Sequence, residues 1–261
     1  MANAKEIQNR IRSIQDTMKI TRAMYMMSSM KLRKAKQQLE DTEPLSHFPD
    51  MEHIYFDNRS SDNAESFKKK AYIVLTGDKG MAGAYNHNVI KEAQALCDNS
   101  DNYMLFVVGE IGRQYFLGQG YPVKEDFRFT ATNPSMHRAR VITELIVDMY
   151  NREQIDEVYV IYTKMANSIK EEVDVRQLLP LKTHQFIKQE NYDNDGNFLI
   201  YPSPKKVLKK VVYNYVTGFI YGALVEASAS EENARMMAMQ SATDNAEEML
   251  KDLSVQYNRV R

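Results

Sequence analysis

This sequence of 261 residues has little of what marks several common classes of protein. Its one cysteine, Cys97, excludes an internal disulfide framework and is typical of a reducing compartment. Tryptophan is absent and glycine numbers only ten, while sixteen methionines favour a helix-rich chain. No apolar run approaches the length of a membrane span, and residues 1–5 lack the apolar core of a secretory signal. We therefore expect an intracellular protein that does not insert into a membrane.

Charge is nearly balanced over the whole chain but is concentrated at one end. The net charge is −1 and the isoelectric point is near 6.5, which argues against general binding to nucleic acid or to a membrane surface. Residues 1–40, however, contain nine basic and three acidic side chains, a net charge of +6. One end of the molecule is therefore expected to be a basic rod.

The first forty residues have the heptad pattern of a coiled coil. Apolar and small residues recur at alternating steps of four and three from Ile7 to Leu39, with no glycine or proline between them. This pattern predicts an N-terminal coiled-coil helix over residues 1–40. One of its two series becomes smaller along the chain, which would allow close approach of a partner helix: Ile7, Ile14, Thr21, Ser28 and Ala35.

The end of the chain has the same pattern over a longer stretch. Ser203 is a favourable N-cap and Pro204 suits the first helical position, so we predict a C-terminal coiled-coil helix over residues 203–261. Its seam again alternates steps of four and three, from Leu208 to Val260.

Between the two helices, residues 71–200 alternate strand and helix signals. Continuous apolar runs separated by helices indicate a mainly parallel sheet with helices packed on it, a Rossmann-like α/β domain. Residues 41–70, with Pro44, Pro49 and a polar run, are expected to connect this domain to the first helix. The predicted strands are residues 71–76, 103–108, 157–163 and 173–181, and the predicted helices are residues 84–97, 110–117 and 135–152.

Both terminal helices attach to one small domain, so they must be antiparallel if they lie side by side. The expected fold is a long antiparallel coiled coil of the N- and C-terminal helices plus the central α/β domain. If both helices leave the domain at the same level, the longer one overhangs by roughly 30 Å. Either another protein covers this overhang or the chain aggregates. Its apolar side chains would be Leu250, Leu253, Tyr257 and Val260.

Residues 77–83 (GDKGMAG) are the segment most like a ligand site. Glycines at the start of a helix could hold a phosphate. The spacing, however, fits neither a P-loop nor a dinucleotide fingerprint, so we favour a strand-to-helix turn. The five histidines are scattered without metal-ligand spacing, and no catalytic triad can be argued. We predict no catalytic, cofactor-binding or metal-binding residue.

Side chains of the first helix indicate a surface that meets partners. Four methionines lie close together on it: Met24, Met26, Met27 and Met30. Core packing explains a methionine on the seam, but these four cannot all face one seam. Soft, unbranched side chains that point outward suit a surface that meets changing partners. The basic residues Arg33, Lys34 and Lys36 have two interpretations of equal weight, a solvated face or a surface for an acidic partner.

Three groups of segments carry a family resemblance. Those on the first helix are residues 4–7 (AKEI), 19–24 (KITRAM) and 30–35 (MKLRKA). Those on the last helix are residues 202–204 (PSP), 226–231 (EASASE), 234–239 (ARMMAM) and 242–245 (ATDN). The domain contributes residues 76–80 (TGDKG) and Asn86. In this order they resemble the gamma subunit of F-type ATP synthases along essentially the whole chain.

The resemblance implies a non-catalytic rotor shaft that couples proton flow through the membrane sector to conformational cycling of the catalytic beta subunits. The implied partners are a ring of three alpha and three beta subunits, the epsilon subunit and the membrane c-ring, with no cofactor and no nucleic acid. The implied location is the cytoplasmic face of a bacterial inner membrane, where the chain is peripheral. The residues that match the family's contacts with beta are Met24, Lys31, Arg33, Lys34 and Arg235.

The sequence departs from the family at two points. Family members continue past the region of residues 257–259 into an Ile-Thr-x-Glu segment, so contacts of that segment are not carried over. Cys97 stands alone, which excludes the thiol control of chloroplast members.

Two other classes of function remain as alternatives. A coiled-coil adaptor would need a self-sufficient helix pair, and the expected overhang argues against it. A nucleotide-dependent enzyme built on the α/β domain would need a phosphate motif, and the sequence has none.

Overall fold

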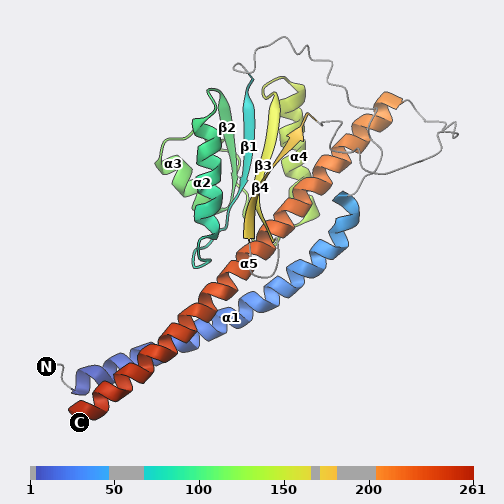
Figure 1. The fold of residues 1–261 in the computed structure, drawn as a ribbon. Helices are drawn as coiled ribbons and strands as arrows, with labels where there is room; N and C mark the ends of the chain where they lie inside the picture. Colours follow the sequence, from blue (N-terminus) through green and yellow to red (C-terminus); the bar gives the residue numbers. More distant parts are fainter. Residues whose placement is uncertain (1–3, 47–67, 166–170, 181–203) are drawn as a thin grey trace.

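The computed structural model describes residues 4–46, 68–165, 171–180 and 204–261. Figure 1 shows a small α/β domain and a long rod of two helices that extends away from it. The two helices are α1 (Ala4–Ser46) and α5 (Pro204–Val260). The N-terminal end of α1 and the C-terminal end of α5 lie together at the far end of the rod, so the helices are antiparallel, as the sequence predicts.

A four-stranded sheet in the order β2-β1-β3-β4 forms the centre of the domain. β1 pairs in parallel with β2 and β3, while β4 pairs antiparallel with β3 at one edge. The first three strands are continuous apolar runs because parallel strands are covered on both faces. The strands, each overlapping its predicted position, are β1 (Lys70–Leu75), β2 (Tyr103–Val108), β3 (Glu157–Met165) and β4 (Glu171–Leu179).

Helices cover both faces of the sheet, which confirms the predicted α/β architecture. On one face, Tyr72 and Val74 of β1 pack against α2 and α3. On the other face, Ile73 packs in a core that includes residues of α4 and of the first half of α5. The three helices of the domain are α2 (Tyr85–Asp98), α3 (Glu110–Gly118) and α4 (Met136–Asn151).

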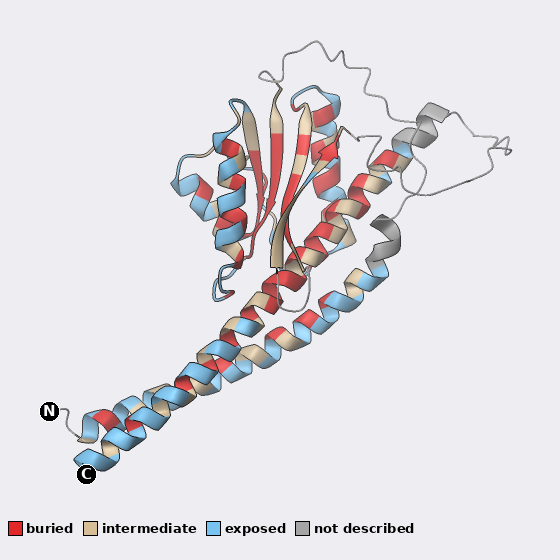
Figure 2. Cartoon of the chain, viewed as in Figure 1, coloured by how far each residue is buried: buried red, intermediate tan, exposed pale blue. Residues whose placement is uncertain are grey.

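The predicted overhang of the last helix is wrong. The first half of α5 lies along the sheet, where Val216 and Ile220 are buried in the domain core. Farther along, Thr243 of α5 lies opposite Thr21 of α1, with their hydroxyl oxygens 2.8 Å apart. Because two α-helices rise equally per residue, counting from this contact places the start of α1 opposite the end of α5. Leu253, which was expected in the overhang, is buried. Figure 2 shows buried positions recurring on both helices toward the tip.

The prediction failed because it placed the exits of both helices from the domain at one level. The extra length of α5 lies beside the sheet instead of beyond α1. α1 therefore lies beside α5 along the whole described rod. The overhang no longer argues against a coiled-coil adaptor.

The first helix is longer than predicted. We placed its end at residue 40, but α1 continues through Pro44 and ends at Ser46. A proline in the last turn of a helix removes one backbone hydrogen bond and leaves the preceding turns intact, so the helix ends just after it. The rest of the predicted connection, residues 47–67, and the predicted end of the α/β domain, residues 181–200, lie outside the described residues.

Candidate partner-binding surface

The seam between α1 and α5 is built largely from small side chains. Ser28 and Ala35 of α1 and Ala229 of α5 are buried. Ala35 and Ala229 form one cluster with Leu32, against which Met236 packs. Closer to the tip, Thr21 and Thr243 are in contact through their hydroxyl groups. Each hydroxyl also lies within hydrogen-bonding distance of a backbone carbonyl in its own helix. The series of decreasing size in α1 therefore faces α5.

The outward side of α1 combines exposed methionines with cations. Met26, Met27 and Met30 are 66%, 51% and 67% exposed. Residues three and four apart share one side of a helix, so Met30 is aligned with Met26 and with Arg33. The expectation that some of these methionines face outward is confirmed.

The four predicted contact residues of α1 are not equally available. Lys31, Arg33 and Lys34 are exposed, and Met24 is half-buried. Lys31 Nζ lies 3.0 Å from Glu232 Oε1 of α5, so its charge is partly neutralised within the chain. Arg33 and Lys34 have no ion pair with any other described residue. We call the exposed set Met26, Met27, Met30, Arg33 and Lys34 the outer face of α1.

Arg235, the fifth predicted contact, lies inside the joint between the rod and the domain. Its guanidinium group pairs with Glu231 and lies 3.0 Å from Glu232 Oε1, and the residue is only 8% exposed. It also lies 3.5 Å from the carbonyl oxygens of Lys79 and Gly80, in the turn after β1. Burial raises the pKa of Glu231, although the pairing with Arg235 opposes this shift. The structure therefore does not place Arg235 on the outer face.

Polar contacts to the sheet complete this joint. Ser230 Oγ donates a hydrogen bond to the carbonyl oxygen of Thr163 in β3, at 3.1 Å. Asn233 Nδ2 donates to Glu171 Oε1 in β4, also at 3.1 Å. We call Glu231, Glu232 and Arg235, with these partners and the turn after β1, the shaft joint. Sequence reasoning missed it, although the spacings of four and three from Glu231 and Glu232 to Arg235 were local signals for it.

The glycine-rich segment after β1 contributes to the joint as a turn. Gly77 N donates a hydrogen bond to Asn86 Oδ1 of α2, at 2.8 Å. A Cβ atom at Gly77 would lie 2.8 Å from the carboxyl carbon of Glu231. The glycine is therefore needed for close approach of the domain to α5, which supports the strand-to-helix interpretation of residues 77–83.

Two features that bear on chemistry are the metal-ligating side chains and the one thiol. Among them, no three His, Cys, Asp or Glu side chains are grouped so that they could hold a metal ion. Burial raises the pKa of the Cys97 thiol to about 12, so this thiol is a poor nucleophile at neutral pH. None of the described helices combines the length and the apolar character needed to cross a bilayer.

The fold and the shaft joint together define a class of protein. In this class, the two terminal helices form a shaft, and buried ion pairs hold the shaft to an α/β domain. A family model described as ATP synthase matches residues 3–261. The ATP synthase gamma chain of Ruminiclostridium cellulolyticum is 42% identical over 275 residues, which cover 99% of this chain and 92% of that relative. The chain belongs to the ATP synthase gamma family. The gamma subunit is the central rotor stalk of the enzyme.

Two further comparisons agree with this assignment. A gamma chain of Acetobacterium woodii, described as sodium ion specific, is 36% identical and matches 99% of this chain and 93% of its own length. A chain in the rotor of the Euglena gracilis mitochondrial ATP synthase has the same fold at 16% identity, with a TM-score of 0.67. This match covers 99% of the present chain and 97% of the Euglena chain.

Proposed function

We propose that this chain is a non-catalytic shaft whose rotation couples ion flow through a membrane sector to conformational change in catalytic beta subunits. Its proposed partners are a ring of three alpha and three beta subunits around the helices, with the epsilon subunit and a c-ring near the domain. Its proposed location is the cytoplasmic face of a bacterial inner membrane, where it is peripheral. The outer face of α1 is the observation that carries this proposal.

The outer face has the chemistry that a rotating contact needs. A shaft that stops at three equivalent positions should not bind deeply to one of them. Methionine side chains are unbranched and polarisable, so they can repack against successive partner surfaces at small cost. Arg33 and Lys34 have no ion pair within the described chain and can reach an acidic partner surface. Lys31 can contribute less, because it already pairs with Glu232.

We assign Arg235 to the shaft joint instead of to the contact with beta. Torque has to pass between the domain and the helices, and a joint made of buried charge pairs resists sliding. Moving Arg235 away from Glu231 and Glu232 would leave two carboxylates in a buried setting, which is costly.

The test is a charge reversal in the assembled enzyme. With Arg33→Glu and Lys34→Glu together, ATP-driven ion pumping in membrane vesicles should fall severalfold relative to ATP hydrolysis, because an acidic partner now repels the shaft. Pumping is followed with a pH probe and separately with a sodium assay, since one relative is described as sodium ion specific. The matched control, Arg33→Lys with Lys34→Arg, keeps both charges and should pump normally.

Unchanged pumping per ATP hydrolysed in the charge-reversed enzyme would contradict the electrostatic part of the proposal. An equal loss in the control would show that side-chain shape matters there and charge does not.

A further inference from the structure

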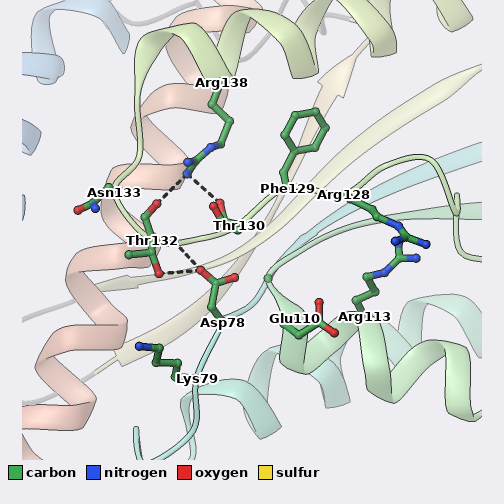
Figure 3. A pocket seen from close by; sticks show the side chains of 11 residues that line it. Asp78, Lys79, Glu110, Arg113, Arg128, Phe129, Thr130, Thr132, Asn133 and Arg138 are labelled. Atoms are coloured by element: carbon green, nitrogen blue, oxygen red, sulfur yellow. Dashed lines mark hydrogen bonds between the residues drawn. The ribbon is translucent and has the colours of Figure 1, made fainter.

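A pocket of about 780 Å³ opens on the α/β domain, away from the outer face of α1. It adjoins the shaft joint, because the turn after β1 contributes to both. Loops after β1 and β2 line it together with the segment that leads into α4. Figure 3 shows the side chains that line it. Four of them are cationic and two are carboxylates, which gives the lining a net charge of +2: Lys79, Arg113, Arg128, Arg138, Asp78 and Glu110.

Two of the arginines converge without a counter-ion. Arg113 Nη1 and Arg128 Nε lie 3.3 and 3.4 Å from one and the same acceptor, the carbonyl oxygen of Glu125. Their guanidinium groups lie close together on one side of the pocket in Figure 3. Neither forms an ion pair with a described residue. Arg113 Nη1 also lies 3.5 Å from the carbonyl oxygen of Phe127. Because each guanidinium has five N–H donors, these two carbonyls leave most of the donors open to a ligand.

The carboxylates of the pocket are already occupied with other partners. Asp78 accepts hydrogen bonds from the backbone N–H groups of Ala131 and Thr132 and from the Thr132 hydroxyl, at 2.7 to 3.1 Å. These bonds hold the pKa of Asp78 below its ordinary value, although partial burial acts to raise it. Glu110 accepts from Gln114 Nε2 at 2.8 Å. Both carboxylates keep their charge, but neither forms an ion pair with Arg113 or Arg128.

The N–H groups at the start of α3 already have hydrogen-bond partners within the chain, so they would not hold a ligand. The N–H of Ile111 donates to the carbonyl of Gly77, and the N–H of Gly112 donates to Thr76 Oγ1. A ligand in this pocket would be held by side chains. Arg138, on another wall, is fixed by hydrogen bonds to the carbonyls of Thr130 and Thr132 at 2.8 and 2.9 Å.

We propose that this pocket binds a phosphorylated small molecule, with Arg113 and Arg128 holding its phosphoryl oxygens. Planar guanidinium groups bind phosphate through two parallel hydrogen bonds, and the net positive lining favours a ligand with several negative charges. The volume is within the range of small-molecule sites. The pocket lies at the carboxyl ends of β1 and β2. Lys79 supplies a further exposed cation, and Phe129 an apolar wall.

Titration calorimetry on the purified full chain tests this site, with inorganic phosphate, pyrophosphate and ATP as separate probes at low ionic strength. At least one probe should bind saturably, with one molecule per chain, and added salt should weaken it. Arg113→Gln with Arg128→Gln should raise its Kd by about tenfold or more, because charge-assisted hydrogen bonds are lost. Tighter binding of ATP than of pyrophosphate identifies a nucleotide as the ligand, whereas equal binding identifies the phosphoryl group alone.

Arg140→Gln is the matched control, because Arg140 is exposed on α4 and does not line the pocket. It should leave the Kd unchanged. Should the double variant fail to fold, Lys79→Gln at an exposed position serves instead, with an expected rise in Kd of about threefold.

Two results would overturn the site. One is the absence of saturable binding of all three probes at millimolar concentration. The other is equal affinity in the wild-type chain and in the folded arginine double variant. A variant that assembles poorly with partner subunits, while no probe binds the wild-type chain, would show that the pocket receives an acidic protein segment instead.

Discussion

Helix α5 meets its surroundings differently beside the domain and near the tip of the rod. Beside the domain it is packed against the sheet, and the side chains of Glu231 and Arg235 are each only 10% exposed. Near the tip, the described part of the chain places only α1 beside it, and the side chains of the pair Arg22–Glu247 are 57% and 46% exposed. Both contacts join an arginine to a glutamate, yet their surroundings give them opposite weights.

This difference separates two tasks along one helix. Buried charge pairs are costly to break because each partner would be left without solvent or a counter-ion. Exposed pairs contribute little because water and salt screen them. The shaft is therefore held in one arrangement where it joins the domain, and the exposed pair near the tip adds little to that hold.

The largest expected effect comes from removing the arginine of each pair. Arg235→Met should lower the free energy of unfolding by roughly 3–5 kcal/mol, because Glu231 and Glu232 lose their shared cation while buried. Arg22→Met, at the exposed pair, should lower it by about 0–1 kcal/mol. Urea denaturation of the purified chain, followed by circular dichroism, measures both.

A second substitution separates charge from packing in the joint. Adding Glu231→Met to Arg235→Met removes the carboxylate that would have no cation left, since Glu232 still pairs with Lys31, and should restore part of the lost stability. Similar losses for Arg235→Met and Arg22→Met would remove the contrast between the two regions.

An intermediate effect is expected from the turn that packs against the joint. Gly77→Ala should cost roughly 1–3 kcal/mol, because its Cβ would lie 2.8 Å from a carboxyl carbon that the pair with Arg235 holds in place. Gly80→Ala, three residues away, has no atom within 4 Å of the added Cβ and should change stability by less than about 0.5 kcal/mol. Urea denaturation curves of the two variants measure this difference in stability. Overlapping curves would mean that the turn is not tightly packed at Gly77.

The elements of this fold could be predicted because their signals are local. Apolar runs marked the strands, and the heptad pattern of residues 7–39 marked the first helix and showed that some methionines must face outward. The resemblance supplied the family. Antiparallel pairing followed from the attachment of both helices to one domain.

The shaft joint could not be predicted, because it depends on contacts between distant parts of the chain. Arg235 approaches the carbonyl of Lys79 across 156 positions of sequence, and no helical pattern reports that approach. For the same reason, the seam of α5 did not reveal that its first half packs on the sheet. The arginine pair of the pocket likewise depends on how the loop after α3 folds back.

The smallest expected effect belongs to the distal seam, at the contact of Thr21 with Thr243. Thr21→Val or Thr243→Val alone should cost about 1 kcal/mol, since each leaves the other buried hydroxyl with one partner fewer. The double variant should cost less than the sum of the two, because two apolar side chains of the same shape then meet. A double-mutant cycle by urea denaturation measures this coupling. Strictly additive losses would mean that the two hydroxyls do not interact, and that the distal seam depends on side-chain shape alone.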